Sequence, residues 1–93
     1  MSPLDQRFRK AVNATFNIWI EAVARDLERG QTEGTVRRDV DAREIAAFVV
    51  ASIEGSFGLA KGAQSPALLR SNLGVLSSFL ESLRTTSKKI RKV

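Results

Sequence analysis

The chain lacks cysteine, histidine and tyrosine, three residue types that carry much of the chemistry of proteins. Without cysteine it has no disulfide and no thiol nucleophile, and without cysteine and histidine the usual zinc sites are excluded. The absence of histidine also removes the side chain that most often transfers protons near neutral pH. We therefore do not expect an enzyme, and the sequence implies neither a cofactor nor a metal site.

Long apolar runs are also missing. No uninterrupted stretch approaches the roughly 20 residues that a membrane-spanning helix needs. The first residues, Met-Ser-Pro-Leu-Asp-Gln-Arg-Phe, contain no apolar core of a signal peptide. We expect a cytoplasmic protein with no membrane partner.

Positive charge is in excess, but the excess lies at one end. The chain has 15 Lys and Arg against 10 Asp and Glu, and five basic residues with no acidic one fall in the last ten positions. Residues 1–83 are therefore neutral by count. The tail, residues 85–93, is either a flexible, solvated terminus or a weak contact for nucleic acid. The candidate contacts are Lys88, Lys89, Arg91 and Lys92.

The two prolines each follow a serine, in the pairs Ser2-Pro3 and Ser65-Pro66, which is typical of a helix N-cap and first helical position. Asp41, followed by Glu44, resembles a capping box. Apolar residues recur at steps of three and four after each of these points. The pattern predicts an all-α fold with three long helices at about 4–29, 41–61 and 65–84. The first two helices are expected to end at Gly30 and Gly62.

The second and third predicted helices are apolar over more than the roughly 100° that a single core requires. We expect one face of this pair to pack on the first helix. The other face would pack on a second copy and form a four-helix bundle. Gly55 and Gly58 lie inside the second helix, where each costs about 1 kcal/mol relative to alanine, so they need a packing or ligand reason.

Other features leave alternatives open. Trp19 shares a stripe with Phe16 and Val23, and Phe48 can meet it from the second helix, as core or as the lining of a pocket for an apolar ligand. Acidic residues are mostly matched by nearby bases, such as Glu21 with Arg25 and Asp26 with Arg29. Such pairs are typical of solvated helix faces.

Three stretches in order resemble TetR-type transcriptional regulators. Residues 16–41 carry Trp, Leu and Gly, then Glu-Gly, Val-Arg and two Asp, at spacings similar to that family's. Residues 46–61 resemble its next helix, with the pair Glu54-Gly55, and the leucines of residues 65–83 resemble its last helix. The resemblance covers nearly all of residues 8–84.

The resemblance implies an all-helical bacterial homodimer. The family binds DNA through an N-terminal helix-turn-helix, which this chain does not contain, so residues 1–84 correspond to the effector-binding and dimerisation domain. The implied ligand-binding residues are Phe16, Trp19, Ile20, Val23, Phe48 and Ser52. The implied dimer interface involves Gly55, Phe57, Leu59, Leu76, Phe79, Leu80 and Leu83.

We therefore expect a ligand-sensing and homodimerisation module of such a regulator, with a small hydrophobic effector as its possible ligand. DNA would be bound only through the missing N-terminal domain. One alternative is a structural dimerisation module without a ligand. Another is a small basic helical protein that binds nucleic acid through its C-terminal tail.

Overall fold

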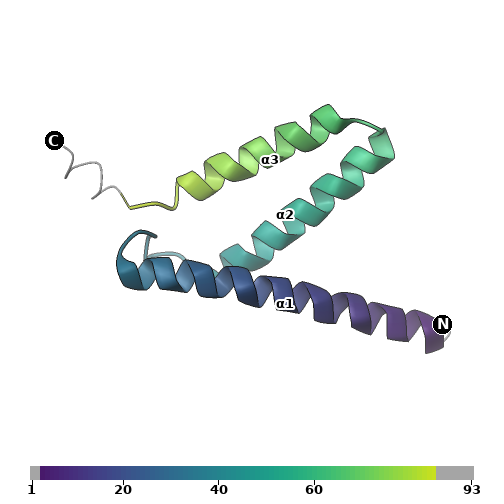
Figure 1. Cartoon of the computed structure of the whole chain (residues 1–93), viewed down its shortest axis with the longest axis horizontal. Coiled ribbons are helices and arrows are strands. Elements are labelled where there is room, and N and C mark those ends of the chain that lie inside the picture. Colours follow the sequence, from purple (N-terminus) through teal and green to yellow (C-terminus); the bar gives the residue numbers. More distant parts are fainter. Residues whose placement is uncertain (1–2, 86–93) are drawn as a thin grey trace.

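The computed structural model describes residues 3–85 and consists there of three helices and no strand (Figure 1). Helix α1 spans Pro3–Glu33, α2 spans Ala42–Ala63 and α3 spans Pro66–Glu81. The predicted all-α fold with three long helices is confirmed. The bundle with a second copy stays a prediction, because the structure holds one chain. The predicted cap at Ser2 and the candidate contacts at positions 88–92 lie outside the described residues.

Two helix starts are confirmed in atomic detail. The Asp41 carboxylate accepts hydrogen bonds from the backbone N–H groups of Arg43, at 2.9 Å, and Glu44, at 3.0 Å. The Ser65 hydroxyl accepts one from Leu68 at 3.1 Å, with Pro66 in the first helical position. Both caps satisfy amide groups that have no partner within the helix.

The predicted helix ends are wrong by a few residues. Helix α1 continues through Gly30 and ends before Gly34, whose φ of +84° is the left-handed conformation that glycine adopts readily. Helix α2 continues through Gly62 and ends in Gln64, with φ of 51°, while the Ser65 N–H donates to the Ala60 carbonyl at 2.9 Å. Turn geometry after each helix, rather than the first glycine reached, determines these ends.

Helix α3 ends at Glu81, three residues before the predicted end, because the chain turns there to pair with the α1–α2 connector. Arg37 N–H donates to the Leu83 carbonyl at 2.8 Å, and Thr85 N–H donates to the Thr35 carbonyl at 3.2 Å. Val36 and Arg84 form an isolated antiparallel bridge between them. We call this pairing of residues 34–37 with residues 83–85 the clasp.

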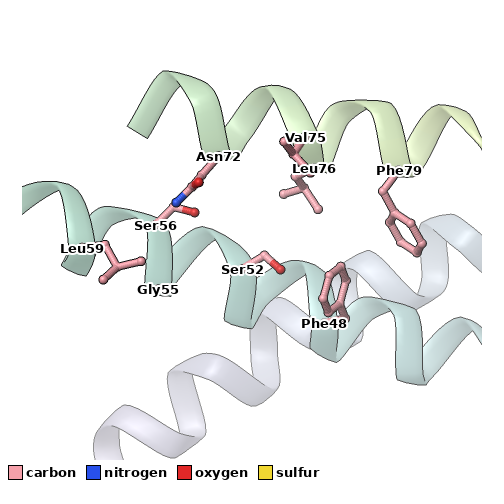
Figure 2. A pocket seen from close by; sticks show the side chains of 9 residues that line it. All are labelled: Phe48, Ser52, Gly55, Ser56, Leu59, Asn72, Val75, Leu76 and Phe79. Carbon is pink, nitrogen blue, oxygen red and sulfur yellow. The ribbon is translucent and has the colours of Figure 1, made fainter. Parts of the chain in front are cut away.

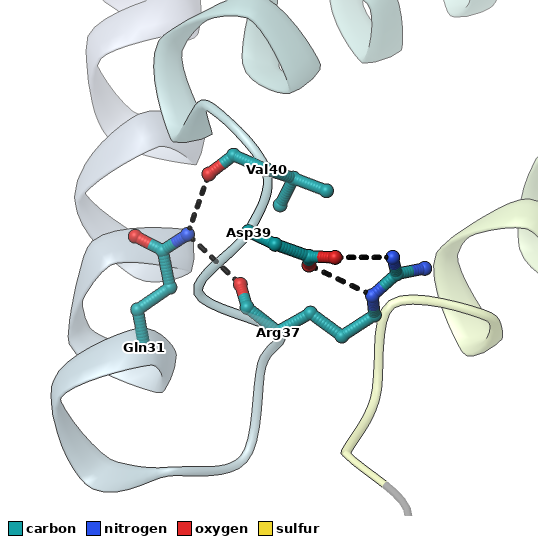
Figure 3. Close-up of polar contacts among 4 residues, drawn as sticks. All are labelled: Gln31, Arg37, Asp39 and Val40. Atoms are coloured by element: carbon teal, nitrogen blue, oxygen red, sulfur yellow. Dashed lines mark hydrogen bonds and ion pairs between the residues drawn. The ribbon is translucent and has the colours of Figure 1, made fainter.

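The connector is also fastened to the end of α1. The Gln31 side-chain amide donates to two backbone carbonyls of the connector, that of Arg37 at 3.0 Å and that of Val40 at 2.9 Å (Figure 3). Gly30 is buried beneath Val36, which occupies the space that a Cβ on the glycine would need. The connector is therefore held by hydrogen bonds and by one close packing contact.

The three helices form a single layer. The molecule measures 60 × 30 × 15 Å, and its thickness is close to the diameter of about 10–12 Å of one helix with its side chains. Its radius of gyration is 16.7 Å, whereas a compact domain of this length has about 12 Å. Helix α2 packs on α1 and on α3, while the described parts of α1 and α3 diverge (Figure 1). Most domains bury a core between two layers, so this chain leaves faces uncovered.

The core is accordingly small and consists mainly of short side chains. Its buried apolar residues come largely from α2, and they are Ala24, Ala42, Ala46, Val49, Val50, Ala60, Leu76 and Leu83. By length and composition α2 is also apolar enough to cross a membrane, and only 28% of its most apolar window is buried. The same length and composition occur in core helices of soluble proteins. Much of the apolar surface of α2 is therefore not covered by the other described residues.

Candidate interface groove between α2 and α3

A groove of about 510 Å³ runs between α2 and α3, and no residue of α1 lines it (Figure 2). The residues from each helix follow steps of three and four, which place them on one helical face. They are Phe48, Ser52, Gly55, Ser56 and Leu59 from α2, and Asn72, Val75, Leu76 and Phe79 from α3. The groove is therefore a continuous surface built from one face of each helix.

One end of the groove is aromatic, and the other carries two polar side chains beside the apolar Leu59 (Figure 2). Phe48 and Phe79 meet edge to face, with ring centroids 5.3 Å apart and ring planes at 71°. At the other end lie the buried Ser56 and the half-buried Asn72. The two ends give the groove a direction, which a partner of matching pattern can recognise.

Three large apolar side chains along the groove are more than half exposed to solvent. Phe48 is 51% exposed, Leu59 is 60% exposed and Val75 is 69% exposed. Single exposed apolar residues are normal on proteins, but a contiguous patch marks an interaction site. These three side chains line one groove, so they form such a patch.

Packing among the described residues does not explain the glycines inside α2 and α3. A Cβ added at Gly55, Gly58, Gly62 or Gly74 would meet no atom of residues 3–85 within 4 Å. Each glycine costs a helix interior about 1 kcal/mol relative to alanine. Gly55 lines the groove, so the space it leaves open is space that a closely approaching partner can fill.

The structure separates the six predicted ligand-binding residues into two groups. Phe16, Trp19, Ile20 and Val23 lie on α1, where the Phe16 and Trp19 rings pack with centroids 5.7 Å apart. Phe48 and Ser52 line the α2–α3 groove instead. The sequence allowed Phe48 to meet Trp19, but within the described residues the Phe48 ring contacts Phe79 and the Trp19 ring contacts Phe16. A ligand-binding role for these residues stays a prediction.

The predicted dimer residues divide differently. Leu76 and Leu83 are buried within the chain's own core, although Leu76 also lines the groove floor. Gly55, Leu59 and Phe79 line the groove, and Phe57 is exposed on α2. Leu80 is half-buried. The groove residues that were assigned neither to the ligand site nor to the interface are Ser56, Asn72 and Val75. Their spacing from Phe79 and Ser52 along each helix was the signal that could have found them.

The ion pairs of the described residues lie at the surface. Asp26 and Arg29 pair as predicted, at 3.3 Å, whereas Glu21 pairs with Arg43 of α2 and not with Arg25. Arg37 donates two hydrogen bonds to the Asp39 carboxylate, from Nε at 2.9 Å and from Nη2 at 2.7 Å (Figure 3). The Arg37 hydrogen bonds lower the pKa of Asp39 and raise that of Arg37. Within residues 3–85 no three acidic side chains gather as a candidate metal site.

Comparison with known proteins gives one match. The family model described as the tetracyclin repressor-like C-terminal domain matches residues 1–75 of the 93 residues. No curated protein and no solved structure matches the chain. The matched region contains α1, α2 and the first part of α3, including most of the groove.

Proposed function

The chain belongs to the family of tetracyclin repressor-like C-terminal domains, and on this basis we propose that it is the effector-sensing and homodimerisation module of a transcription regulator. Domains of this family are parts of regulators and are not enzymes. The proposed module acts in the cytoplasm of a bacterium. It reaches DNA through a separate N-terminal helix-turn-helix.

The exposed α2–α3 groove is the observation that carries the dimerisation proposal. A second copy presents the same two helices, so two grooves facing each other across a two-fold axis form a four-helix bundle. Such packing covers Phe48, Leu59 and Val75, which are exposed in the single chain. It also explains why a glycine occupies position 55 inside a helix, because the absence of a side chain allows the helices of two copies to approach closely.

Sedimentation equilibrium of the full chain tests the dimer. We expect the wild type to be a dimer and Val75→Glu to be a monomer, because the carboxylate would be buried without a partner at the interface. Ile18→Glu is the matched control, since Ile18 of α1 is 67% exposed and Val75 is 69% exposed. It should remain a dimer. A monomeric wild type, or a dimeric Val75→Glu variant, would contradict the proposal, as would spontaneous insertion of the wild type into lipid vesicles.

The effector-sensing proposal rests on the family and on the aromatic surface of α1. Phe16 and Trp19 pack against each other while Trp19 is still 45% exposed, so an apolar molecule has ring surface to cover. Ile20 and Val23 extend this surface along α1. Phe48 and Ser52 belong to the proposed site only if the bound molecule or a second copy brings the groove and α1 together.

Trp19 is the sole tryptophan, so its fluorescence reports directly on this surface. We expect 8-anilinonaphthalene-1-sulfonate, an apolar probe, to change Trp19 emission in a saturable way, and Phe16→Ala to weaken the effect. Lys61→Ala is the control, because Lys61 lies near the C-terminal end of α2 and not on the Trp19 surface, so this variant should respond to the probe as the wild type does. If emission stays unchanged with this probe and with a panel of hydrophobic effectors, the chain is a dimerisation module without a ligand.

A further inference from the structure

A second hollow lies at the clasp and shares no lining residue with the groove. It has a volume of about 510 Å³ and is lined by the residues Arg37, Arg38, Asp39, Ser82, Arg84 and Thr85. The clasp itself creates this cleft, because it holds the connector of α1 and α2 beside the chain that leaves α3. Three arginines and Asp39 therefore line one cleft, and Arg84 also pairs with Glu81 beside it.

The three arginines are held in place to different degrees. Arg37 is fixed by its two hydrogen bonds to Asp39, and Arg84 pairs with Glu81 at 3.2 Å. Arg38 makes no ion pair with any acidic residue in the described range 3–85. Its Nε donates to the Gln31 carbonyl at 2.8 Å, which uses one of five N–H donors. Arg38 therefore presents a positioned positive charge that no carboxylate of the described chain neutralises.

We propose that the clasp cleft binds the phosphate backbone of nucleic acid. Guanidinium groups are well suited to phosphate, because their planar array of donors matches two phosphate oxygens. The cleft is open, and the side chains of Arg37 and Arg84 are 46% and 56% exposed, which fits a backbone crossing the surface better than a small enclosed ligand. After Thr85 the sequence continues with Lys88, Lys89, Arg91 and Lys92 and no acid. The cleft, with three arginines and Asp39, and the sequence that follows it therefore both carry a net positive charge.

This site is tested by measuring how tightly the full chain binds a DNA duplex of about 20 base pairs at several salt concentrations. Each phosphate contact adds about −0.9 to the slope of log K against log salt, where K is the association constant. We expect the double variant Arg38→Gln, Arg84→Gln to bind about tenfold more weakly and to lose nearly two from that slope. Glutamine retains a donor for the Gln31 carbonyl, so the connector should stay folded. Circular dichroism checks the fold.

Two controls separate a positioned site from a general effect of charge. Arg29→Gln, Arg70→Gln removes the same charge from exposed helix positions outside the cleft and should leave the slope unchanged. Arg38→Lys, Arg84→Lys keeps the charge but loses the planar array of donors, so its affinity should lie between those of the wild type and the glutamine variant. Absence of DNA binding by the wild type would overturn the proposal. So would equal losses in the two glutamine pairs, or binding only to inorganic phosphate.

Discussion

Phe48 of α2 directs its ring at the ring of Phe79 on α3, edge to face, with centroids 5.3 Å apart. This contact joins the two helices at the open end of their hairpin, away from the turn at residues 64–65. It therefore fixes how α2 and α3 are rotated against each other. That rotation decides which side chains line the groove.

The Phe48–Phe79 contact predicts a measurable coupling. In a double-mutant cycle of Phe48→Leu and Phe79→Leu, we expect a coupling free energy of about 0.5–1.5 kcal/mol, the usual value for such ring pairs. Urea unfolding at one fixed protein concentration measures it. Phe57→Leu combined with Phe79→Leu is the control, because no ring contact joins Phe57 to Phe79 in the described chain. Additive losses in the first cycle would contradict the role of the ring contact.

Gly30 and Gly62 predict opposite responses to alanine. A methyl group at Gly30 would overlap Val36, so Gly30→Ala should lower the free energy of unfolding by about 1–3 kcal/mol. Gly62 lies inside α2 with open space around it, so Gly62→Ala should raise that free energy by up to about 1 kcal/mol. Thermal unfolding compares the two. Adding Val36→Ala to the Gly30→Ala variant should restore part of the lost free energy of unfolding. If it restores none, the contact with Val36 is not the cause of the loss.

Gly55 distinguishes packing within the chain from packing between copies. A Cβ at this exposed position would meet no described atom within 4 Å, so we expect Gly55→Leu to leave the helix content unchanged. In a dimer that closes over the groove it should weaken association by about 1–3 kcal/mol, or roughly 5- to 150-fold in the dissociation constant. Analytical ultracentrifugation measures this constant. Gly62→Leu, outside the groove, should change it little. A Gly55→Leu variant that dimerises as tightly as the wild type would place the interface elsewhere.

The Arg37–Asp39 contact predicts a dependence on pH. Hydrogen bonds from Arg37 hold the pKa of Asp39 below its ordinary value of 3.8. The stabilisation it contributes is therefore complete above that ordinary value and is lost as the pH falls through the lower value of the folded state. The difference in melting temperature between the wild type and Asp39→Asn should be constant near neutral pH and vanish in acid. A difference that persists in strong acid would show that the charged contact is not its source.

Local chemistry made much of the fold predictable. Asp41 and Ser65 carry short polar side chains that accept backbone hydrogen bonds at a helix start, so the sequence marked both starts correctly. Helix ends were less predictable, because Gly30 and Gly62 are tolerated inside helices. Gly34 and Gln64 take the left-handed turns.

The site depended on contacts that sequence spacing does not determine. Helical spacing does not determine whether Phe48 meets Trp19 of α1 or Phe79 of α3, and in the structure it meets Phe79. The cleft around Arg37 and Arg84 was not predicted, because the clasp is formed by two short irregular segments without a periodic pattern. Charge counting along the chain cannot reveal charges that the fold brings together.

The clasp also has a consequence for the order in which the chain folds. The Thr85 hydroxyl donates to the Gly34 carbonyl, 51 positions away in the sequence, whereas α2 and α3 are neighbours joined by a tight turn. Closing a long loop costs more conformational entropy than forming a hairpin of adjacent helices. We expect the clasp to form last and to open first, so the amide protons of Arg37 and Thr85 should exchange with solvent before those of the α2 interior.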